Sequence, residues 1–215
     1  MADAAQVAIM NTALALLGQE PVADLDEAAR TGSVALTKLL RHMDTARDVV
    51  LARHGWVCAL EYVTLSAAVI PGYTNWRYPT VFYLPGNALR VWEIDGCPET
   101  DWGTRWQAGT VETGAGARRI VRAASAWNGG VDGLSVAYVR RANWASLDIH
   151  VADAVAHDLA SRGCYAITGD KAAADRWAQR AETRAVLAVS TDGTQEGGQP
   201  GLSASIPARL RAQAR

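Results

Sequence analysis

The spacing of apolar residues divides the chain into a helical beginning, a strand-rich middle and a helical end. Near the N-terminus, apolar side chains recur every three or four residues, as on one face of an α-helix, at Val7, Met10, Leu14 and Leu17. Asp3 precedes this run as a candidate N-cap, and Gly18 follows it where a left-handed C-cap is common. A first helix between Asp3 and Gly18 is therefore expected.

A second and longer helix is predicted after Pro21, which cannot simply continue the first one. Asp24 or Asp26 is its candidate N-cap, and the pattern continues to Gly55, which gives about 28 residues or roughly 40 Å of helix. Its apolar stripe consists of Ala29, Leu36, Leu39, Leu40, Met43, Ala46 and Val50. We expect an antiparallel helical hairpin over residues 1–55 that buries Leu14, Leu17, Leu36, Leu40 and Met43 together.

The pattern changes at Trp56, where short strand-like runs begin to alternate with turn signals. The predicted strands are Leu60–Leu65, Val81–Leu84, Leu89–Ile94, Arg105–Glu112, Arg118–Arg122 and Leu134–Arg140. The predicted turns are Asp95-Gly96, Gly114-Ala115-Gly116 and Asn128-Gly129-Gly130. Residues 56–145 are therefore expected to form an antiparallel β-rich insertion.

The helical period returns near Ser146. One apolar stripe, interrupted at Gly163, consists of Leu147, Val151, Ala154, Val155, Leu159 and Ala166. After a turn at Gly169-Asp170, a second helix capped by Asp170 is expected to run to the region of Ser190. Its apolar face is mostly alanine, which favours a closely packed neighbour, and consists of Ala174, Trp177, Ala178, Ala181, Ala185 and Ala188.

Together these elements predict an α+β fold. Residues 146–190 form a second helical hairpin that packs with residues 1–55 into one α-helical bundle, because the apolar face of each hairpin is too large to leave in water. The antiparallel β-rich module is inserted between the hairpins, and an extended C-terminal tail follows them. With 215 residues, of which 49% are hydrophobic, the chain is long enough to bury such a core.

Residues 191–215 are predicted to be a flexible linker and a docking tail. The linker, Thr191–Pro200, is rich in Gly, Gln and Thr, so we expect it to be disordered in the free protein. The tail has three apolar and three basic residues and no acidic one, and we expect these to bind a partner: Leu202, Ile206, Arg209, Leu210, Arg211 and Arg215. The alternatives are an inert frayed terminus or a weak contact with DNA.

The charge balance argues against a protein built to grip nucleic acid. The chain has 21 basic and 22 acidic residues and a net charge of −1, whereas phosphate binding usually needs a positive excess. All basic residues except Lys38 and Lys171 are arginine, which fits either the codon bias of a GC-rich genome or bidentate contacts of the guanidinium. There is no apolar run of about 18 residues and no secretory signal pattern, so use or assembly in a cytoplasm is expected.

Few residues form a pattern typical of catalysis. His150, Asp153 and His157 have the spacing that places three metal ligands on one helix face, with a solvated polar face as the alternative. The sequence contains no P-loop, no dinucleotide-binding loop and no G-x-S-x-G or H-E-x-x-H motif. We therefore assign no catalytic, cofactor or metal residue, and favour an interaction or structural protein over an enzyme.

The remaining histidines, cysteines and tryptophans are assigned structural roles. His42 and His54 are expected at the surface or last turn of the long helix. Cys58, Cys97 and Cys164 are too far apart for a zinc pair and are expected to be buried thiols in a reducing compartment. Seven of the eight tryptophans lie between Trp56 and Trp144, which favours a core or oligomer interface over a platform for carbohydrate or bases.

Several segments, in this order, resemble motifs of phage head–tail adaptor proteins, the family of tail tubular protein A of short-tailed phages and of adaptors in long-tailed phages and gene transfer agents. Leu17-Gly18-Gln-Glu-Pro21-Val22-Ala-Asp-Leu25 resembles the family's Leu-Gly-x-x-Pro-Val/Ile-x-x-Leu, and Arg53-His54-Gly55-Trp56 resembles its Arg-x-Gly-Trp. Tyr83–Val91 resembles its Tyr-x-Leu-Pro-x-Asp-x-Leu-Arg-Val, with Asn87 at the acidic position. The segments Val136–Val139, Ala152–Ala160 and Ile167–Asp170 resemble its closing helical hairpin.

The resemblance covers roughly residues 5–190 and implies a structural virion protein without catalytic residues or cofactors. It implies a ring, a dodecamer in this family, that docks under the portal protein and meets downstream tail or stopper proteins, with no membrane partner. Double-stranded DNA would only pass through its lumen, and a near-neutral chain agrees with that because strong binding would stop passage. Another tail or assembly protein, such as a tail terminator, and a metal-dependent hydrolase that uses His150, Asp153 and His157 are the alternatives.

Overall fold

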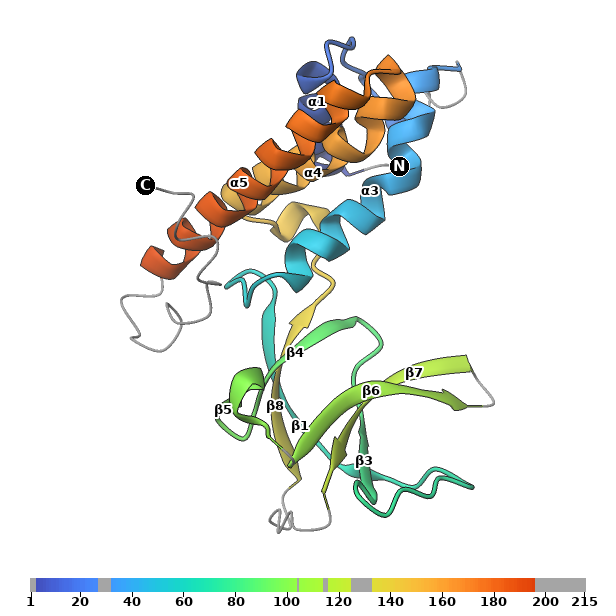
Figure 1. Cartoon of the computed structure of the whole chain (residues 1–215), viewed down its shortest axis with the longest axis vertical. Coiled ribbons are helices and arrows are strands. Elements are labelled where there is room, and N and C mark those ends of the chain that lie inside the picture. Colours follow the sequence, from blue (N-terminus) through green and yellow to red (C-terminus); the bar gives the residue numbers. More distant parts are fainter. Residues whose placement is uncertain (1–2, 27–31, 104, 114–115, 125–132, 196–215) are drawn as a thin grey trace. The chain divides into compact units, whose positions relative to one another are not determined.

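We describe a computed structural model of the chain for residues 3–26, 32–103, 105–113, 116–124 and 133–195. The chain divides into two compact units (Figure 1). A helical unit combines Met1–Cys58 with Ala142–Arg215, and a β unit consists of Ala59–Arg141. Both ends of the chain thus build one unit and the middle builds the other, which confirms the predicted α+β class with its inserted β module.

The first helix, α1 (Ala4–Leu16), begins and ends as its sequence predicts. The Asp3 carboxylate accepts a hydrogen bond from the Ala5 amide at 3.2 Å, and Gly18 has a φ of 67°. The side-chain amide of Asn11 then fixes the loop that follows, because it donates to the Val22 carbonyl at 2.9 Å and its oxygen accepts from the Val22 amide at 2.8 Å. These two hydrogen bonds pair both backbone polar groups of Val22, which no helix or strand pairs.

The predicted long helix from Asp24 or Asp26 to Gly55 is wrong in its first third. The helix, α3, spans only Val34–Ala52, and Ser33 caps it by accepting from the Leu36 amide at 3.4 Å. Leu25 and Asp26 are helical as well, but Gly32 between the two segments has a φ of 85°, a left-handed conformation that no helix contains. Ala29 of the predicted stripe lies outside the described residues.

The C-terminal hairpin consists of α4 (Ile149–Thr168) and α5 (Lys171–Gln195), and a short 3-10 turn, η2 (Trp144–Ser146), precedes it. The predicted turn is confirmed, since Gly169 has a φ of 72° and the Asp170 carboxylate accepts from the Ala173 amide at 3.0 Å. Gly163, however, does not interrupt α4. The predicted flexible linker is also wrong for Thr191–Gln195, which continue α5.

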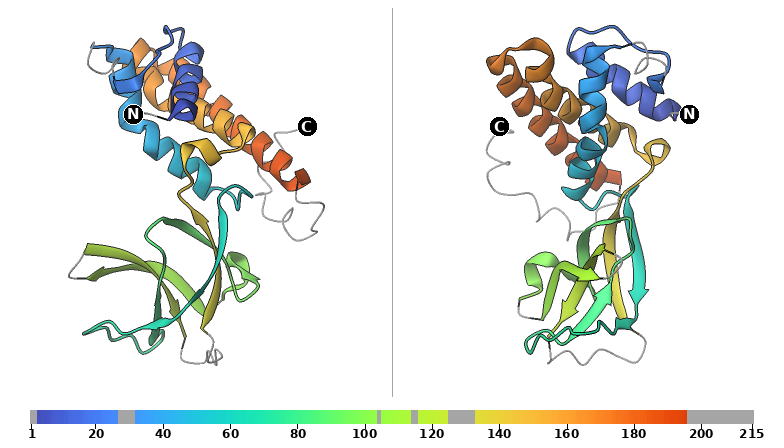
Figure 2. Two further views of the ribbon diagram at one scale, coloured as in Figure 1. Left: turned by 180° about the vertical axis from the view of Figure 1, so that it is seen from behind. Right: turned by 90° about the vertical axis from the view of Figure 1, so that its right-hand side faces the viewer.

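The core of the helical unit is centred on α4, which packs against α1, α3 and α5 (Figure 2). Leu14, Leu17, Leu36 and Met43 are buried as predicted, whereas Leu40 is only half-buried. Leu39 takes the place expected of Leu40, with a side chain that is 0% exposed. The later start of α3 does not change which residues share one face of this helix. Leu39 is buried instead of Leu40 because the side of the apolar stripe that contains Leu39 packs against α4.

Gly163 is the point of closest approach between α3 and α4. A Cβ atom at this position would lie 2.3 Å from Cδ2 of Leu39, far inside van der Waals contact. Glycine is therefore present in the middle of a helix, despite its low helix propensity, because only a hydrogen atom fits between the two helices.

The β unit consists of two antiparallel four-stranded sheets (Figure 1). The first has the strand order β1-β8-β4-β5 and the second β2-β3-β7-β6. In chain order the strands are β1 (Leu60–Leu65), β2 (Ala67–Ala68), β3 (Thr80–Tyr83), β4 (Ala88–Ile94), β5 (Cys97–Pro98), β6 (Trp106–Thr113), β7 (Gly116–Ala123) and β8 (Leu134–Arg140), with a 3-10 turn, η1 (Glu99–Asp101), after β5. The six predicted strands are present within two residues at their ends, and the two-residue strands β2 and β5 were not predicted.

Both sheets contribute side chains to one core. Leu65, Val91, Ile94, Leu134, Val136 and Tyr138 come from the first sheet, and Phe82, Trp106, Val121 and Ala123 from the second. The predicted turn at Asp95-Gly96 is confirmed by positive φ values of 47° and 77°, and the Asp95 carboxylate accepts from the Ser135 amide at 3.0 Å. The predicted turns at residues 114–116 and 128–130 include Gly114, Ala115 and Asn128-Gly129-Gly130, which lie outside the described residues.

The contact between α3 and α4 yields a double-variant test. Leu39→Ala is expected to cost about 2–5 kcal/mol of unfolding free energy because it leaves a cavity. Gly163→Ala is expected to cost about 1–3 kcal/mol because the new methyl group displaces a buried side chain. In the double variant that methyl group occupies part of the cavity, so the loss measured in urea melts should be clearly smaller than the sum. Leu40→Ala, at the half-buried neighbour, is the control and should cost less than Leu39→Ala; additive losses would contradict the predicted contact.

Tyr138 makes the β unit sensitive to alkali. Its hydroxyl donates to the Glu61 carboxylate at 2.5 Å, and burial together with that carboxylate raises the pKa of Tyr138 to about 12. The unfolded chain ionises near pH 10, so this stabilisation is complete below pH 10 and is lost between about pH 10 and 12. Urea melts across this range should show a loss on the order of 2 kcal/mol that Tyr138→Phe lacks. An equal alkaline loss in that variant would refute the assignment.

Candidate functional site

The predicted partner-binding residues, Leu202, Ile206, Arg209, Leu210, Arg211 and Arg215, lie outside the described residues, as does the rest of the predicted linker. The structure does describe the part of the chain from which they emerge. The last turns of α5 run to Gln195, and the His54 side chain contacts Asp192 within them. We treat this anchored end of α5 as the candidate site.

A buried histidine–carboxylate contact fixes the end of α5. His54 Nε2 lies 3.4 Å from Asp192 Oδ2, and the two side chains are only 5% and 4% exposed. Sequence analysis expected His54 at the surface or in the last turn of α3, but the helix ends at Ala52 and His54 turns inward. This contact lies in the part of α5 that continues beyond its apolar pattern.

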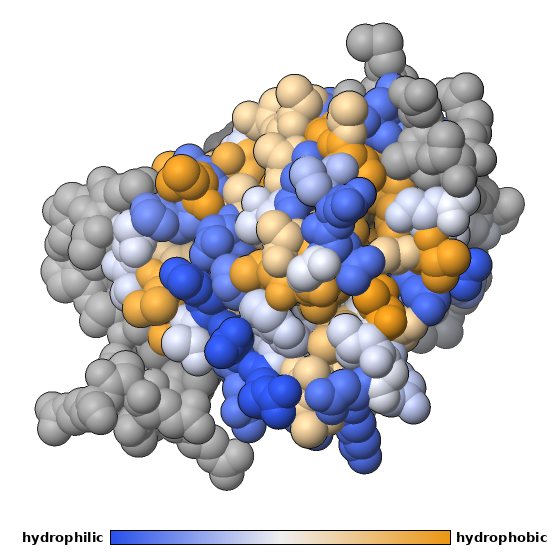
Figure 3. All heavy atoms as spheres, turned by 90° about the horizontal axis from the view of Figure 1, so that it is seen from above, coloured by the Kyte–Doolittle hydropathy of each residue, from blue (hydrophilic) through white to orange (hydrophobic). Residues whose placement is uncertain are grey.

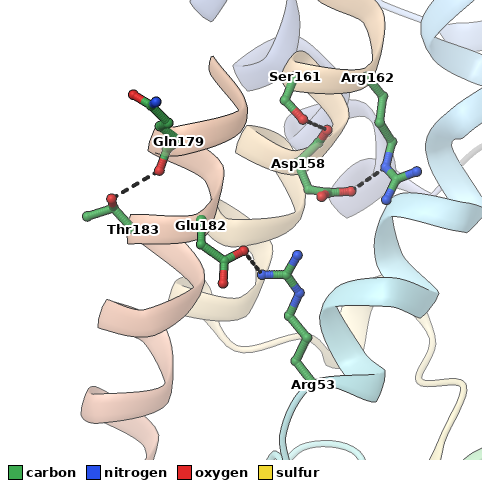
Figure 4. Close-up of polar contacts among 7 residues, drawn as sticks. All are labelled: Arg53, Asp158, Ser161, Arg162, Gln179, Glu182 and Thr183. Carbon is green, nitrogen blue, oxygen red and sulfur yellow. Dashed lines mark hydrogen bonds and ion pairs between the residues drawn. The ribbon is translucent and has the colours of Figure 1, made fainter. Parts of the chain in front are cut away.

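The segment Arg53–Trp56 shapes this contact. Trp56 is fully buried, donates from its indole nitrogen to the Val50 carbonyl at 3.0 Å, and meets the His54 ring edge-on with 5.1 Å between centroids. Arg53, on the outside, forms an ion pair with Glu182 of α5 at 2.5 Å (Figure 4). The four residues that resemble the Arg-x-Gly-Trp motif therefore tie the end of α3 to α5 from inside and outside.

Further polar contacts stiffen the same unit. On α4, the Asp158 carboxylate pairs with Arg162 at 2.5 Å, and the Ser161 hydroxyl donates to the Asp158 carbonyl (Figure 4). Arg47 of α3 is buried over the ring of Trp144, 4.5 Å from its centroid, and pairs with Asp44 at 3.1 Å. Cation–π stacking and ion pairing together offset the entropy that is lost when this long side chain is fixed in one position.

The surroundings of His54 are closely packed. Burial raises the pKa of the nearby Cys58 thiol, and the Asp148 and Asp192 carboxylates add to the rise against a backbone hydrogen bond at Asp148, so this thiol stays protonated and weakly nucleophilic. The crevice beside it, lined by Trp56, Asp148, His150, Val151, Ala188 and Asp192, is too narrow for a water molecule. The arrangement holds chain segments together and leaves no room for a substrate.

The three candidate metal ligands do not converge. His157 is buried, with Nδ1 3.0 Å from the Asp153 carbonyl oxygen and its ring 6.2 Å from that of Trp177, whereas His150 is exposed. One Asp153 oxygen lies 3.5 Å from His157 Nδ1 and the other lies 3.8 Å from Arg184, so these two candidates meet each other without His150. Within residues 3–195, apart from the gaps given above, no group of three His, Cys, Asp or Glu side chains is arranged to hold a metal ion.

The cysteines are less uniformly buried than predicted. Cys164 is buried, but Cys58 and Cys97 are only half-buried, and all three are free thiols. The tryptophans were predicted in a core or an oligomer interface, and both core and surface positions occur: Trp56, Trp102 and Trp106 are core residues, whereas Trp76 is 89% exposed.

The helical unit also exposes apolar side chains that its core does not use. Four large ones stand on three helices, at Val34, Ile149, Tyr165 and Leu187, with exposed fractions between 51% and 78%. Figure 3 shows hydrophobic residues scattered among hydrophilic ones on the face that it presents. Scattered exposed apolar side chains are common on protein surfaces, so these four do not by themselves mark a binding site.

Comparisons with known proteins add no identification. No family model matches this sequence, and no curated protein matches it. Among the described helices, none has both the length and the apolar character needed to cross a membrane.

The His54–Asp192 contact makes the anchored end of α5 testable. Asp192→Ala is expected to cost about 1–3 kcal/mol, since it removes a buried carboxylate from its partner. Hydrogen exchange measured by mass spectrometry should become faster over residues 187–195 and stay unchanged in the centre of α4. Arg53→Gln, which removes only the partly exposed ion pair with Glu182, is the control and should cost less than about 1 kcal/mol. Unchanged exchange in Asp192→Ala would show that α5 holds its last turns without this contact.

Proposed function

We propose that this protein is a head-to-tail adaptor of a phage or gene transfer agent. It is a structural virion subunit that forms a ring, a dodecamer as the resemblance implies, under the portal protein. Downstream tail or stopper proteins bind on its other side, and DNA passes through the lumen. The proposed protein is not an enzyme and has no cofactor.

The structural roles of the residues that carry the resemblance support this proposal. Asn11 and Val22 fix the loop of the Leu-Gly-x-x-Pro-Val segment, and His54 and Trp56 fix the turn after α3. These residues thus stabilise the loop after α1 and the turn after α3. Such structural roles are expected for motifs of a scaffold protein rather than for those of a catalytic centre. The lack of converging ligands among His150, Asp153 and His157 weighs against the alternative of a metal-dependent hydrolase.

The anchored end of α5 is the observation that carries the proposal furthest. A tail that hooks a partner needs a rigid point of attachment, because only then does ordering the tail also position the subunit. The buried contact of Asp192 supplies that point three residues before Gln195, at which α5 and the described part of the chain end. The predicted docking residues Leu202–Arg215 follow it along the chain.

Portal binding by variants of the tail tests the proposal. The protein is mixed with purified portal rings at micromolar concentration and sedimented. The full chain is expected to co-sediment, and a chain that lacks residues 201–215 is expected to lose most of that binding while it melts like the full chain. If the folded full chain stays behind, the adaptor proposal fails, and a tail terminator that does not bind portal becomes the better explanation.

Two matched sets of substitutions separate the forces in the tail. Arg209→Gln, Arg211→Gln and Arg215→Gln together remove the charge, whereas Leu202→Ser, Ile206→Ser and Leu210→Ser together remove the apolar anchors. Both sets should weaken portal binding, by about tenfold or more, because guanidinium groups pair with carboxylates and the anchors fill pockets. A truncated chain that binds portal as well as the full chain would show that the adaptor docks through another surface.

A further inference from the structure

The outer face of the second sheet in the β unit differs in charge from the rest of the molecule. Side chains alternate between the two faces of a strand, and Val121 and Ala123 of β7 point into the core. Arg118 and Arg122 therefore point to the opposite face, on which Ile120 between them is fully buried. The segment between β2 and β3, which includes Arg77, meets this face where Tyr73 contacts Arg122.

Each of these arginines stacks on a tyrosine. The guanidinium carbon of Arg118 lies 4.1 Å from the ring centroid of Tyr83, that of Arg77 lies 5.5 Å from Tyr78, and that of Arg122 lies 6.0 Å from Tyr73. We call this set the arginine–tyrosine face; it consists of Arg77, Arg118, Arg122, Tyr73, Tyr78 and Tyr83. Stacking holds a guanidinium flat and directs its N–H edge away from the ring, so the donors are oriented before any partner arrives.

No carboxylate neutralises this face in the part of the chain that the structure describes. The sequence has no acidic residue between Glu61 and Glu93. Glu112 of β6 pairs in register with Ala117, which shares the core-side alternation of Val121, so it belongs to the other face. Ion pairs of the β unit join Arg90 to Glu99 and Arg140 to Glu61, away from these three arginines.

The three arginines differ in how far their donors are already used. Arg122 donates to the Gln107 side chain and to the Thr110 carbonyl, both at 3.2 Å, and is fixed on the sheet. Arg77 and Arg118 are exposed and make no side-chain hydrogen bond to another described residue. They are therefore the two residues whose oriented N–H groups are open to an external anion.

The strand pairing adds a shape to this charge. β3 pairs with β7 from Ile120 to Ala123, and the Leu84 amide after β3 donates to the Arg119 carbonyl at 3.0 Å, so Gly116–Arg118 pair with β6 alone as a two-stranded ribbon beyond β3 (Figure 1). Arg118 lies on this ribbon. A two-stranded ribbon has a width that the major groove of B-form DNA admits.

We propose that the arginine–tyrosine face binds the phosphate backbone of double-stranded DNA without reading its sequence. Phosphate is an anion that the fork of a guanidinium binds in two places, and successive phosphates suit a row of arginines. Bases of a single strand would need open aromatic faces, but the three tyrosine rings are already covered by guanidinium groups. The choice of a duplex as the occupant rests on the proposed function, and a contact through two exposed arginines is weak and salt-sensitive, so it does not stop the passage of DNA. The anion-binding character rests on the arginines alone.

Binding of a fluorescently labelled duplex of arbitrary sequence, followed by anisotropy, tests the proposal with the full chain. Binding is expected at low salt and should weaken steeply between about 50 and 200 mM salt. Arg77→Gln combined with Arg118→Gln should weaken it at low salt by about tenfold or more. The same double variant should also reduce the slope of log affinity against log salt by about 1.8, which is two phosphate contacts at about 0.9 each.

A matched pair in the helical unit controls for total charge. Arg180 stacks on Trp177 at 4.9 Å, much as Arg118 does on Tyr83, and Arg176 lies one turn before it. Arg176→Gln combined with Arg180→Gln removes the same two charges and should leave DNA binding within about twofold of the unchanged protein. Equal losses in both double variants, or no loss in either, would overturn the assignment of this face.

Two further probes separate other partners from a duplex. If polyglutamate displaces the DNA as readily as unlabelled duplex does, the face binds acidic polypeptides and the proposal is wrong. If a single strand binds more tightly and Trp76→Ala abolishes that binding, stacking on the exposed tryptophan is responsible and the duplex assignment is wrong. Portal co-sedimentation of the full chain and of the Arg77→Gln, Arg118→Gln variant is measured separately. If the full chain binds portal but no DNA, or if the variant binds DNA as well as the full chain does, this inference is refuted and the proposed function still stands.

Discussion

The close approach of α3 and α4 is the constraint on which the helical unit depends. The two helices come from opposite ends of the chain, and their contact at Gly163 leaves no space for even one methyl group beside Leu39. Since α4 also packs against α1 and α5, it connects every described helix of this core. The N-terminal hairpin and the C-terminal hairpin are therefore parts of one folding unit, although the whole β unit separates them in the sequence.

The strand pairing explains how that insertion is accommodated. β1 and β8, the first and last strands of the β unit, are neighbours in one sheet, and the Arg140 amide donates to the Ala59 carbonyl at 2.8 Å. The chain thus leaves and returns at adjacent points. Because the β unit has its own core between two sheets, it needs no helix to bury its apolar side chains.

The sequence predicted elements better than it predicted their ends and their charges. Periodicity located α1, the C-terminal hairpin and six strands, because regular alternation over six or more residues reflects burial directly. It misplaced the start of α3, because the left-handed conformation of Gly32 separates this helix from the residues before it and leaves no mark in the apolar pattern. It also misplaced the end of α5, where the buried contact of Asp192 lies beyond the apolar pattern. The net charge of −1 concealed the arginine–tyrosine face, because acidic residues elsewhere in the chain offset arginines that strand alternation gathers on one side.

The order of the helices along the chain has a consequence for synthesis. α1 and α3 leave the ribosome long before α4, and until α4 follows, side chains such as Leu36 and Leu39 lack the surface that buries them in the finished protein. The β unit, Ala59–Arg141, is synthesised completely before α4. Nascent chains therefore pass through a stage with a folded middle and an exposed apolar N-terminal hairpin, which is the stage at which a chaperone would bind and at which aggregation is most favoured.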